Sequence, residues 1–132
     1  MKKSSIHKRS KATNTAVALK AFFRICALWH LNNSEQITLL GSPAERTFYD
    51  WKEKKDGKLS RDVLERISYI LGIFKALQIL FPDNSLADTW IKKPNHATIF
   101  NGISALDRML LGNVSDLLIV RQYLDAQRGG WA

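Results

Sequence analysis

The sequence has very few of the residues that build disulfides and metal sites. A single cysteine, Cys26, excludes an intramolecular disulfide, and its apolar surroundings are typical of a small buried hydrophobic residue. The three histidines, His7, His30 and His96, have no metal-ligand spacing with this cysteine or with carboxylates. The sequence therefore predicts no metal site, and such scarcity of cysteine is typical of an intracellular, here cytoplasmic, protein.

Motifs of catalysis and of membrane insertion are missing as well. There is no glycine-rich dinucleotide motif, no P-loop and no nucleophile elbow, and Asp107 and Asp116 are not placed as an acid/base pair on one helix. No apolar run is long enough to span a bilayer, and Lys20 and Arg24 interrupt the one candidate for a signal peptide. We therefore expect a binding protein rather than an enzyme, without a cofactor, a small-molecule substrate or a membrane partner.

The alternation of apolar and polar residues that marks half-buried strands is also absent. Apolar residues recur instead every three or four positions, as in Val17, Ala21 and Ile25, so an all-α fold is expected. Helices are predicted at residues 16–31, about 34–40, 43–55, 61–81, 86–92, 105–111 and 114–127, with caps at Asn33 or Ser34, Ser42, Ser60 and Ser104. The helix 61–81 is apolar nearly all round in its second half, so we expect it to be a long central helix joining two halves.

One predicted helix has the features of a DNA reader. Ser42 is placed as its N-cap, and Glu45, three residues further on, completes a capping box. Phe48 and Trp51 lie three residues apart and are expected to pack inward, which leaves polar and basic groups outside. A short helix packed on another in this way is what a helix-turn-helix needs in the DNA major groove, although an ordinary surface helix has the same pattern.

Positive charge is concentrated in the half of the chain that contains this helix. Residues 1–81 hold 15 Lys and Arg against 7 Asp and Glu, whereas residues 82–132 hold 5 of each. Such an uneven distribution is typical of a protein with a polyanion partner, and with the predicted helix-turn-helix it points to DNA. The residues predicted to contact DNA are Arg46, Thr47, Tyr49, Lys52, Lys54 and Lys55 of this helix, with Thr47, Tyr49 and Lys52 toward the bases, and Lys8, Arg9 and Lys11 nearer the amino terminus.

The start of the chain has the composition of a basic arm. Residues 1–20 contain Lys and Arg but no acid, and almost nothing apolar precedes Ala16. This composition predicts that residues 1–15 are disordered and that they lie along phosphates or in a minor groove, as homeodomain arms do. A solubilising tail is the alternative interpretation.

Residues 59–68, Leu-Ser-Arg-Asp-Val-Leu-Glu-Arg-Ile-Ser, and several motifs in the last third of the chain carry a family resemblance. Those motifs are 87–91 (Ala-Asp-Thr-Trp-Ile), Pro94-Asn95, 100–106 (Phe-Asn-Gly-Ile-Ser-Ala-Leu), Leu111-Gly112 and 120–131 (Val-Arg-Gln-Tyr-Leu-Asp-Ala-Gln-Arg-Gly-Gly-Trp). Over residues 35–132 the chain resembles antitoxins of the Xre/MbcA/ParS type. It departs from their pattern in one respect, since the segment from Gly41 to Thr47 is one residue longer than the commonest helix-turn-helix spacing.

The resemblance implies an organisation and a function. Such antitoxins are encoded beside RES-type toxins, which consume NAD; their amino-terminal half binds operator DNA and their carboxyl-terminal half holds the toxin. Residues 16–81 are therefore expected to form a helix-turn-helix and dimerisation region, and residues 82–132 a small helical toxin-binding region with a flexible tail. The residues implied in toxin binding are Pro94, Asn95, Arg121, Tyr123, Asp125, Arg128, Gly129, Gly130, Trp131 and Ala132.

The flexible tail, residues 128–132, is expected to enter the active site of the toxin. Its two glycines give the backbone freedom to follow a narrow cleft. The Trp131 indole can stack where a nicotinamide or adenine ring would sit, and the terminal carboxylate can pair with arginines that otherwise hold a phosphate. In the alternative interpretation, Trp131 folds back on its own domain.

A homodimer is expected as well, because one recognition helix binds weakly and two-fold operators are met by dimers. The apolar residues Ile73, Ile79 and Leu80 are the predicted interface, unless the carboxyl-terminal half covers them. Two other functions stay open at this point. One is a plain helix-turn-helix transcriptional regulator whose carboxyl-terminal half only dimerises, and the other is a nucleic-acid enzyme whose site the sequence does not reveal.

Overall fold

The structure, a computed structural model, describes residues 2–129, with side chains from Asn14 onward. Its helices are α1 (Lys2–Leu28), α2 (Asn33–Leu39), α3 (Glu45–Lys54), α4 (Arg61–Leu80), α5 (Asn84–Trp90), α6 (Ala105–Met109) and α7 (Val114–Gly129). This described part contains no strand, only an isolated antiparallel bridge between Pro94 and Ser104. The expected all-α fold is confirmed. None of these helices has the length and apolar character that a membrane crossing requires.

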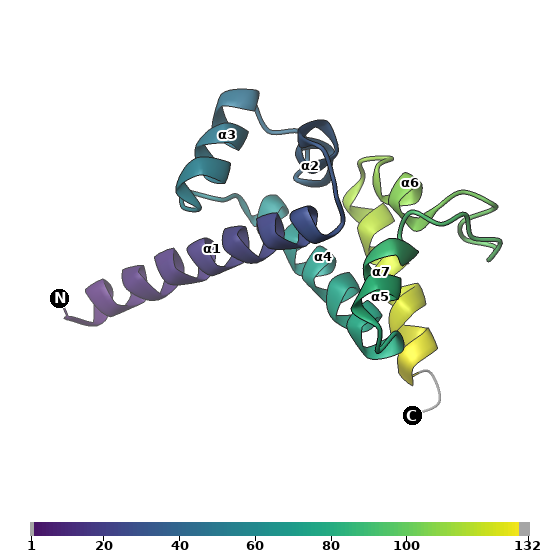
Figure 1. The fold of residues 1–132 in the computed structure, drawn as a ribbon. Helices are drawn as coiled ribbons and strands as arrows, with labels where there is room; N and C mark the ends of the chain where they lie inside the picture. The colour runs from purple at the N-terminus through teal and green to yellow at the C-terminus, as the bar shows by residue number, and fades with distance from the viewer. Residues whose placement is uncertain (1, 130–132) are drawn as a thin grey trace.

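The long helix α4 is the spine of the molecule, as predicted. It packs against α1 in the amino-terminal half and against α5 and α7 in the carboxyl-terminal half. Figure 1 shows α3 near the first turns of α4, and α5 and α7 beside its last turns. The hydroxyl of Ser60 accepts a hydrogen bond from the Val63 backbone N–H at 3.2 Å, so the predicted cap of this helix is confirmed.

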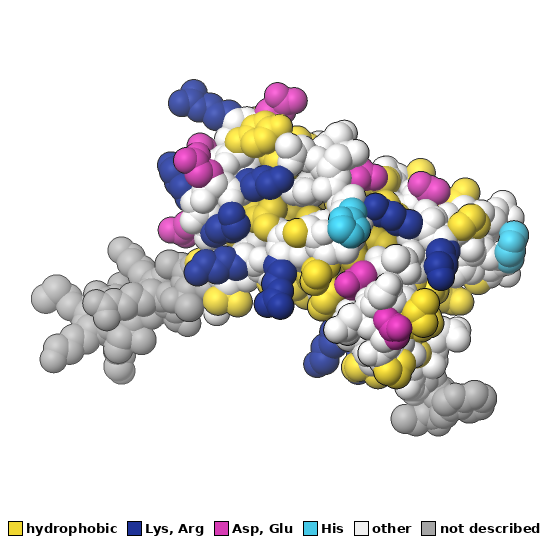
Figure 2. Space-filling model, viewed as in Figure 1, with side chains coloured by type: hydrophobic (Ala, Val, Ile, Leu, Met, Phe, Trp, Pro, Cys, Tyr) yellow, Lys and Arg dark blue, Asp and Glu magenta, His cyan; other side chains and the backbone are white. Residues whose placement is uncertain are grey.

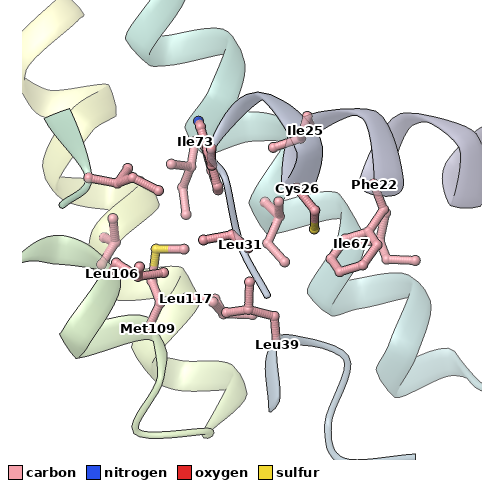
Figure 3. Close-up of a cluster of buried hydrophobic side chains, with 14 of the residues drawn as sticks. Phe22, Ile25, Cys26, Leu31, Leu39, Ile67, Ile73, Leu106, Met109 and Leu117 are labelled. Atoms are coloured by element: carbon pink, nitrogen blue, oxygen red, sulfur yellow. The ribbon is translucent and has the colours of Figure 1, made fainter. Parts of the chain in front are cut away.

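One continuous apolar core runs through both halves. Figure 3 shows its buried side chains converging from α1, α2, α4, α6 and α7: Phe22, Ile25, Cys26, Leu39, Ile67, Ile73, Leu106, Met109 and Leu117. Cys26 is 1% exposed, as predicted, and burial raises the pKa of its thiol to about 12. The thiol is therefore protonated at neutral pH and acts as a core residue rather than a nucleophile.

The amino-terminal stretch is helical, so the prediction of a disordered arm over residues 1–15 is wrong for the part described. Helix α1 begins at Lys2 rather than at Ala16. No glycine or proline precedes Gly41, and the basic and small polar residues at the start have ordinary helix propensities, so nothing local ends the helix there. The side chains of Lys8, Arg9 and Lys11 lie outside the described ones.

Two further helix ends differ from the predicted positions. Asn32, rather than Asn33 or Ser34, caps α2, and it forms a capping box with Glu35. At the other end of the chain, α7 includes residues 128 and 129, so these two form the last turn of a helix rather than the start of a flexible tail. The remaining tail residues, Gly130, Trp131 and Ala132, lie outside the described residues.

The apolar residues predicted to form a dimer interface lie mostly inside the molecule. Ile73 is fully buried and Leu80 packs partly against the core, because α4 is covered by α1 and by the helices of the carboxyl-terminal half. Ile79 is the exposed member of the three, at 52%. The predicted interface is therefore wrong for Ile73, whereas for Ile79 and Leu80 it stays a prediction.

Candidate functional site

Helices α2 and α3 form a helix-turn-helix pair. Residues 40–44 connect them, and the chain turns through two residues with positive φ, Gly41 at 89° and Ser42 at 60°. An N-cap needs an extended backbone, so a left-handed Ser42 cannot serve as one, and the predicted capping box with Glu45 is wrong. Helix α3 starts at Glu45, behind Ala44, without a side-chain cap.

Helix α3 has one buried face and one exposed face. Phe48 is fully buried and Trp51 is 7% exposed, as their spacing predicted. Arg46, Thr47 and Tyr49 are exposed on the outer side of the helix. The structure thus brings these three residues together in the first turns, the part of a recognition helix that meets base edges.

Lys52 and Lys55 are held by their neighbours. The Lys52 ammonium donates to Asn33 Oδ1 at 2.5 Å, and the Asn33 amide donates to the Tyr49 hydroxyl at 3.4 Å. The Lys55 ammonium lies 5.6 Å from the centroid of the Phe23 ring and donates to the Lys52 carbonyl. A contact of either lysine with DNA would have to replace these interactions.

Other basic side chains of the amino-terminal half are more exposed than Lys52 and Lys55. Lys54 is exposed, and so are four cations that the sequence reasoning did not assign to DNA: Lys20, Arg24, Lys58 and Arg61. Figure 2 shows Lys and Arg side chains gathering over α1 and α3 on the visible face. Their exposure was readable from the sequence, since Lys and Arg are almost never fully buried without a partner.

An aromatic cluster joins the helices of the carboxyl-terminal half. The rings of Trp90 and Tyr123 stack with centroids 6.4 Å apart, and Phe100 lies edge-on to them at 6.1 and 5.1 Å. Tyr123 therefore fixes α7 against α5 and the following loop. A hollow of about 190 Å³ opens beside the cluster; its lining residues are Leu80, Phe81, Trp90, Tyr123, Leu124 and Gln127.

The loop between α5 and α6 is shaped by Asn95. The Asn95 backbone N–H donates to the Ile103 carbonyl at 3.1 Å, and the Asn95 side chain accepts from the Ala97 N–H at 2.9 Å. Asn95 is half-buried and has a structural role in this loop, whereas the neighbouring Pro94 is exposed.

Comparison with known proteins assigns each half of the chain to a domain family. One protein-family model, the antitoxin Xre-like helix-turn-helix domain, matches residues 8–72, and a second, the antitoxin Xre/MbcA/ParS C-terminal toxin-binding domain, matches residues 76–130. The chain belongs to the Xre/MbcA/ParS antitoxin family. It is also 53% identical over 121 residues to the uncharacterized protein y4oB of Sinorhizobium fredii (strain NBRC 101917 / NGR234), a match that covers 92% of each chain. Both domains of the antitoxin are non-enzymatic regulatory domains.

In the toxin-binding domain of the antitoxin, the charged residues predicted from α7 lie together. Arg121, Asp125 and Arg128 line a hollow between α7 and α4, with Asp125 between the two arginines. The structure therefore brings these three together. It places Pro94 and Asn95 on a separate loop.

Sequence reasoning missed Arg66, a buried cation that joins the two domains. Arg66 is 8% exposed. Its Nε donates to Asp62 Oδ2 at 2.9 Å, and its Nη1 donates to the carbonyl of Gly112, in the turn before α7, at 3.0 Å. The turn of the helix-turn-helix also reaches this side chain, because a Cβ built on Gly41 would lie 2.9 Å from Arg66 Nε. The pair of Asp62 and Arg66, four residues apart, was visible in the sequence, but the approach of the turns at Gly41 and Gly112 to Arg66 was not.

Proposed function

We propose that the antitoxin neutralises a RES-type, NAD-consuming toxin by occluding its active site, and that it binds operator DNA to regulate its own operon. The observation that carries this proposal is the order of the two domains in one chain, a basic helix-turn-helix domain followed by a toxin-binding domain. The toxin half of the proposal is tested by copurification. We expect the neighbouring gene to encode a RES-type protein that copurifies with the antitoxin and loses its NAD consumption in the complex.

A plain transcriptional regulator is the competing function. It predicts operator binding in the absence of any copurifying toxin. A wild-type antitoxin that binds its own promoter but captures no product of a neighbouring gene would favour this alternative.

For the DNA half, we propose that α3 enters the major groove with Arg46, Thr47 and Tyr49 toward the bases. The support is geometric, because these side chains are exposed while Phe48 and Trp51 anchor the opposite face in the core. Exposed lysines beside α3 supply the phosphate contacts in this arrangement.

Binding to DNA from the antitoxin's own promoter should weaken as salt rises, and Lys54→Ala should make that dependence shallower. Removal of one phosphate contact changes the slope of log affinity against log salt by about 0.9. The measurement is fluorescence anisotropy across a salt series. Lys93→Ala, which removes an exposed lysine from the other domain, is the matched control and should leave the slope unchanged. Equal slopes for all three proteins would count against α3 as the DNA-binding element.

We also propose that the antitoxin is a homodimer. The proposed interface is the groove between α1 and α4, rather than α4 alone as the sequence predicted. The groove is mainly apolar and measures about 350 Å³; its lining residues are Ala21, Arg24, Ile25, Leu28, Leu71 and Phe74. Val17, 59% exposed, and Leu28, 38% exposed, continue the apolar surface along α1. A second copy is the fitting occupant, since a two-fold operator requires two recognition helices.

Leu28→Glu should therefore raise the dimer dissociation constant at least about tenfold, because an interface leucine replaced by a charge must be desolvated on association. Sedimentation velocity at micromolar concentration measures this, and circular dichroism checks that the variant is folded. Leu111→Glu, at a leucine 63% exposed in the turn before α7, is the control and should leave the dimer intact. A wild-type monomer, alone and on DNA, would contradict the proposed interface.

A further inference from the structure

Three cations converge on a hollow between α4 and α7 that the DNA-binding surface does not use. The hollow measures about 360 Å³ and is lined by Gly72, Lys75, Arg121, Asp125, Arg128 and Gly129. Among its described lining residues Asp125 is the one acid, so three positive charges face a single negative charge. Like charges held this close repel one another, and an incoming anion relieves that repulsion.

The single carboxylate of Asp125 does not satisfy the arginines around it. Arg121 Nε lies 3.6 Å from one carboxylate oxygen and Arg128 Nη1 lies 4.0 Å from the other, both too long for strong hydrogen bonds. The three side chains are about a third to a half exposed, so these ion pairs are weak. A guanidinium carries five N–H donors, and most of those in this hollow are therefore available to a ligand.

Gly72 allows Arg121 to lie flat against the backbone of α4. A Cβ at position 72 would be 2.6 Å from Arg121 Nε and 2.8 Å from its Cζ, a distance that no side chain could keep. The guanidinium also lies 5.8 Å from the centroid of the Tyr69 ring, within reach of a cation–π contact. Glycine weakens the interior of a helix, and at this position the missing side chain leaves the room that Arg121 occupies at the wall of the hollow.

We propose that this hollow binds a carboxylate of the toxin, carried by an acidic side chain that enters between Lys75, Arg121 and Arg128. A planar guanidinium suits the two oxygens of a carboxylate. The position also fits, because Arg121, Arg128 and Gly129 belong to the toxin-binding domain and Gly129 is the last residue of α7 before the chain's three final residues. A toxin that receives this tail would lie over the hollow. The inference rests on the proposed function and names the chemistry of one contact in it.

Charge reversal tests the contact with the full antitoxin and its copurified toxin. Lys75→Glu and Arg128→Glu change exposed side chains and should each weaken toxin affinity at least about tenfold at low salt. The difference from wild type should shrink as salt rises. Lys58→Glu, an exposed lysine outside the toxin-binding domain, makes the same charge change and should leave the affinity within about twofold of wild type. Isothermal titration calorimetry at two salt concentrations gives these affinities.

Gly72→Ala tests the orientation of Arg121 without changing any charge. Alanine has a higher helix propensity than glycine, and the atoms that its side chain would meet belong to the flexible Arg121 side chain. The melting temperature of the variant should therefore be no lower than that of wild type. It should nevertheless bind the toxin several-fold more weakly, because Arg121 is displaced. If Gly72 had a purely structural role, toxin affinity would change only when stability changes. A variant as stable as wild type would then bind the toxin as tightly as wild type.

The outcomes separate this inference from the proposed function. If the wild-type antitoxin captures no toxin, the proposed function fails. If the wild type binds and Lys75→Glu, Arg128→Glu and Gly72→Ala all bind as tightly as Lys58→Glu, the proposed function stands and the carboxylate site is wrong. Charge reversals that weaken promoter binding while leaving toxin affinity unchanged would assign the hollow to DNA and would also overturn the inference.

Discussion

Deletion of residues 130–132 is expected to weaken inhibition of the toxin's NAD consumption about 100-fold while leaving the antitoxin folded, because a buried tryptophan anchor commonly dominates an interface. We propose that the Trp131 indole occupies a ring-binding site of the toxin. The measurement is NAD consumption by a fixed amount of toxin against increasing antitoxin.

The place of the cut follows from the structure. A deletion after Gln127 would also remove Arg128 and Gly129, which form the last turn of α7 and line the cationic hollow. A cut after Gly129 removes the tail alone, and Trp131→Ala is the matched single substitution that keeps the chain length. If both variants inhibit as well as the full chain, inhibition arises from the domain surface, and the tail does not occlude the active site of the toxin.

Replacing Arg66 by alanine is expected to destabilise the antitoxin by about 2–4 kcal/mol, which is a fall of roughly 10 °C in melting temperature for a chain of this size. The substitution removes charge-assisted hydrogen bonds to Asp62 and to the Gly112 carbonyl and leaves a cavity where the side chain packed. The range stays below that for a fully buried ion pair, because the Asp62 side chain is 55% exposed and water can replace its partner.

Thermal and urea unfolding of matched variants check this prediction. Arg61→Ala removes an exposed arginine from the first turn of the same helix and should change stability by less than about 0.5 kcal/mol. Arg66→Lys keeps the charge but cannot reproduce two divergent N–H bonds, so it should lie between wild type and Arg66→Ala. Equal stabilities for Arg61→Ala and Arg66→Ala would show that the buried guanidinium is dispensable.

The environment of Arg66 also predicts which binding functions Arg66→Ala would affect. The turn at Gly41 precedes the recognition helix, and the turn at Gly112 precedes α7, yet both meet the same side chain. The hydrophobic core crosses the domain boundary in the same way, with Leu39 and Leu117 in one cluster. We therefore expect Arg66→Ala to lower promoter affinity and toxin affinity together, whereas Lys54→Ala should affect only the promoter.

The sequence by itself determined the helical fold, most helix positions and the division of charge along the chain. The caps at Ser60 and Ser104 were readable because a cap links residues only three apart. The inward face of Phe48 and Trp51 followed from helical periodicity. The division of charge between the two halves needs only counting. The caps and the inward face depend on residues within one or two helical turns of one another, and the charge division depends on composition alone.

The tertiary structure decided what depends on residues far apart in the chain. Ile73 is buried because helices from both halves cover α4, and Arg66 is buried because turns at Gly41 and Gly112 close over it. The backbone conformation of the turn, with Ser42 in the left-handed region, moved the start of α3 and removed its expected cap. Burial and contacts between charged groups depend on packing between segments that lie tens of residues apart in the chain. Local propensity does not tell which of these segments pack together.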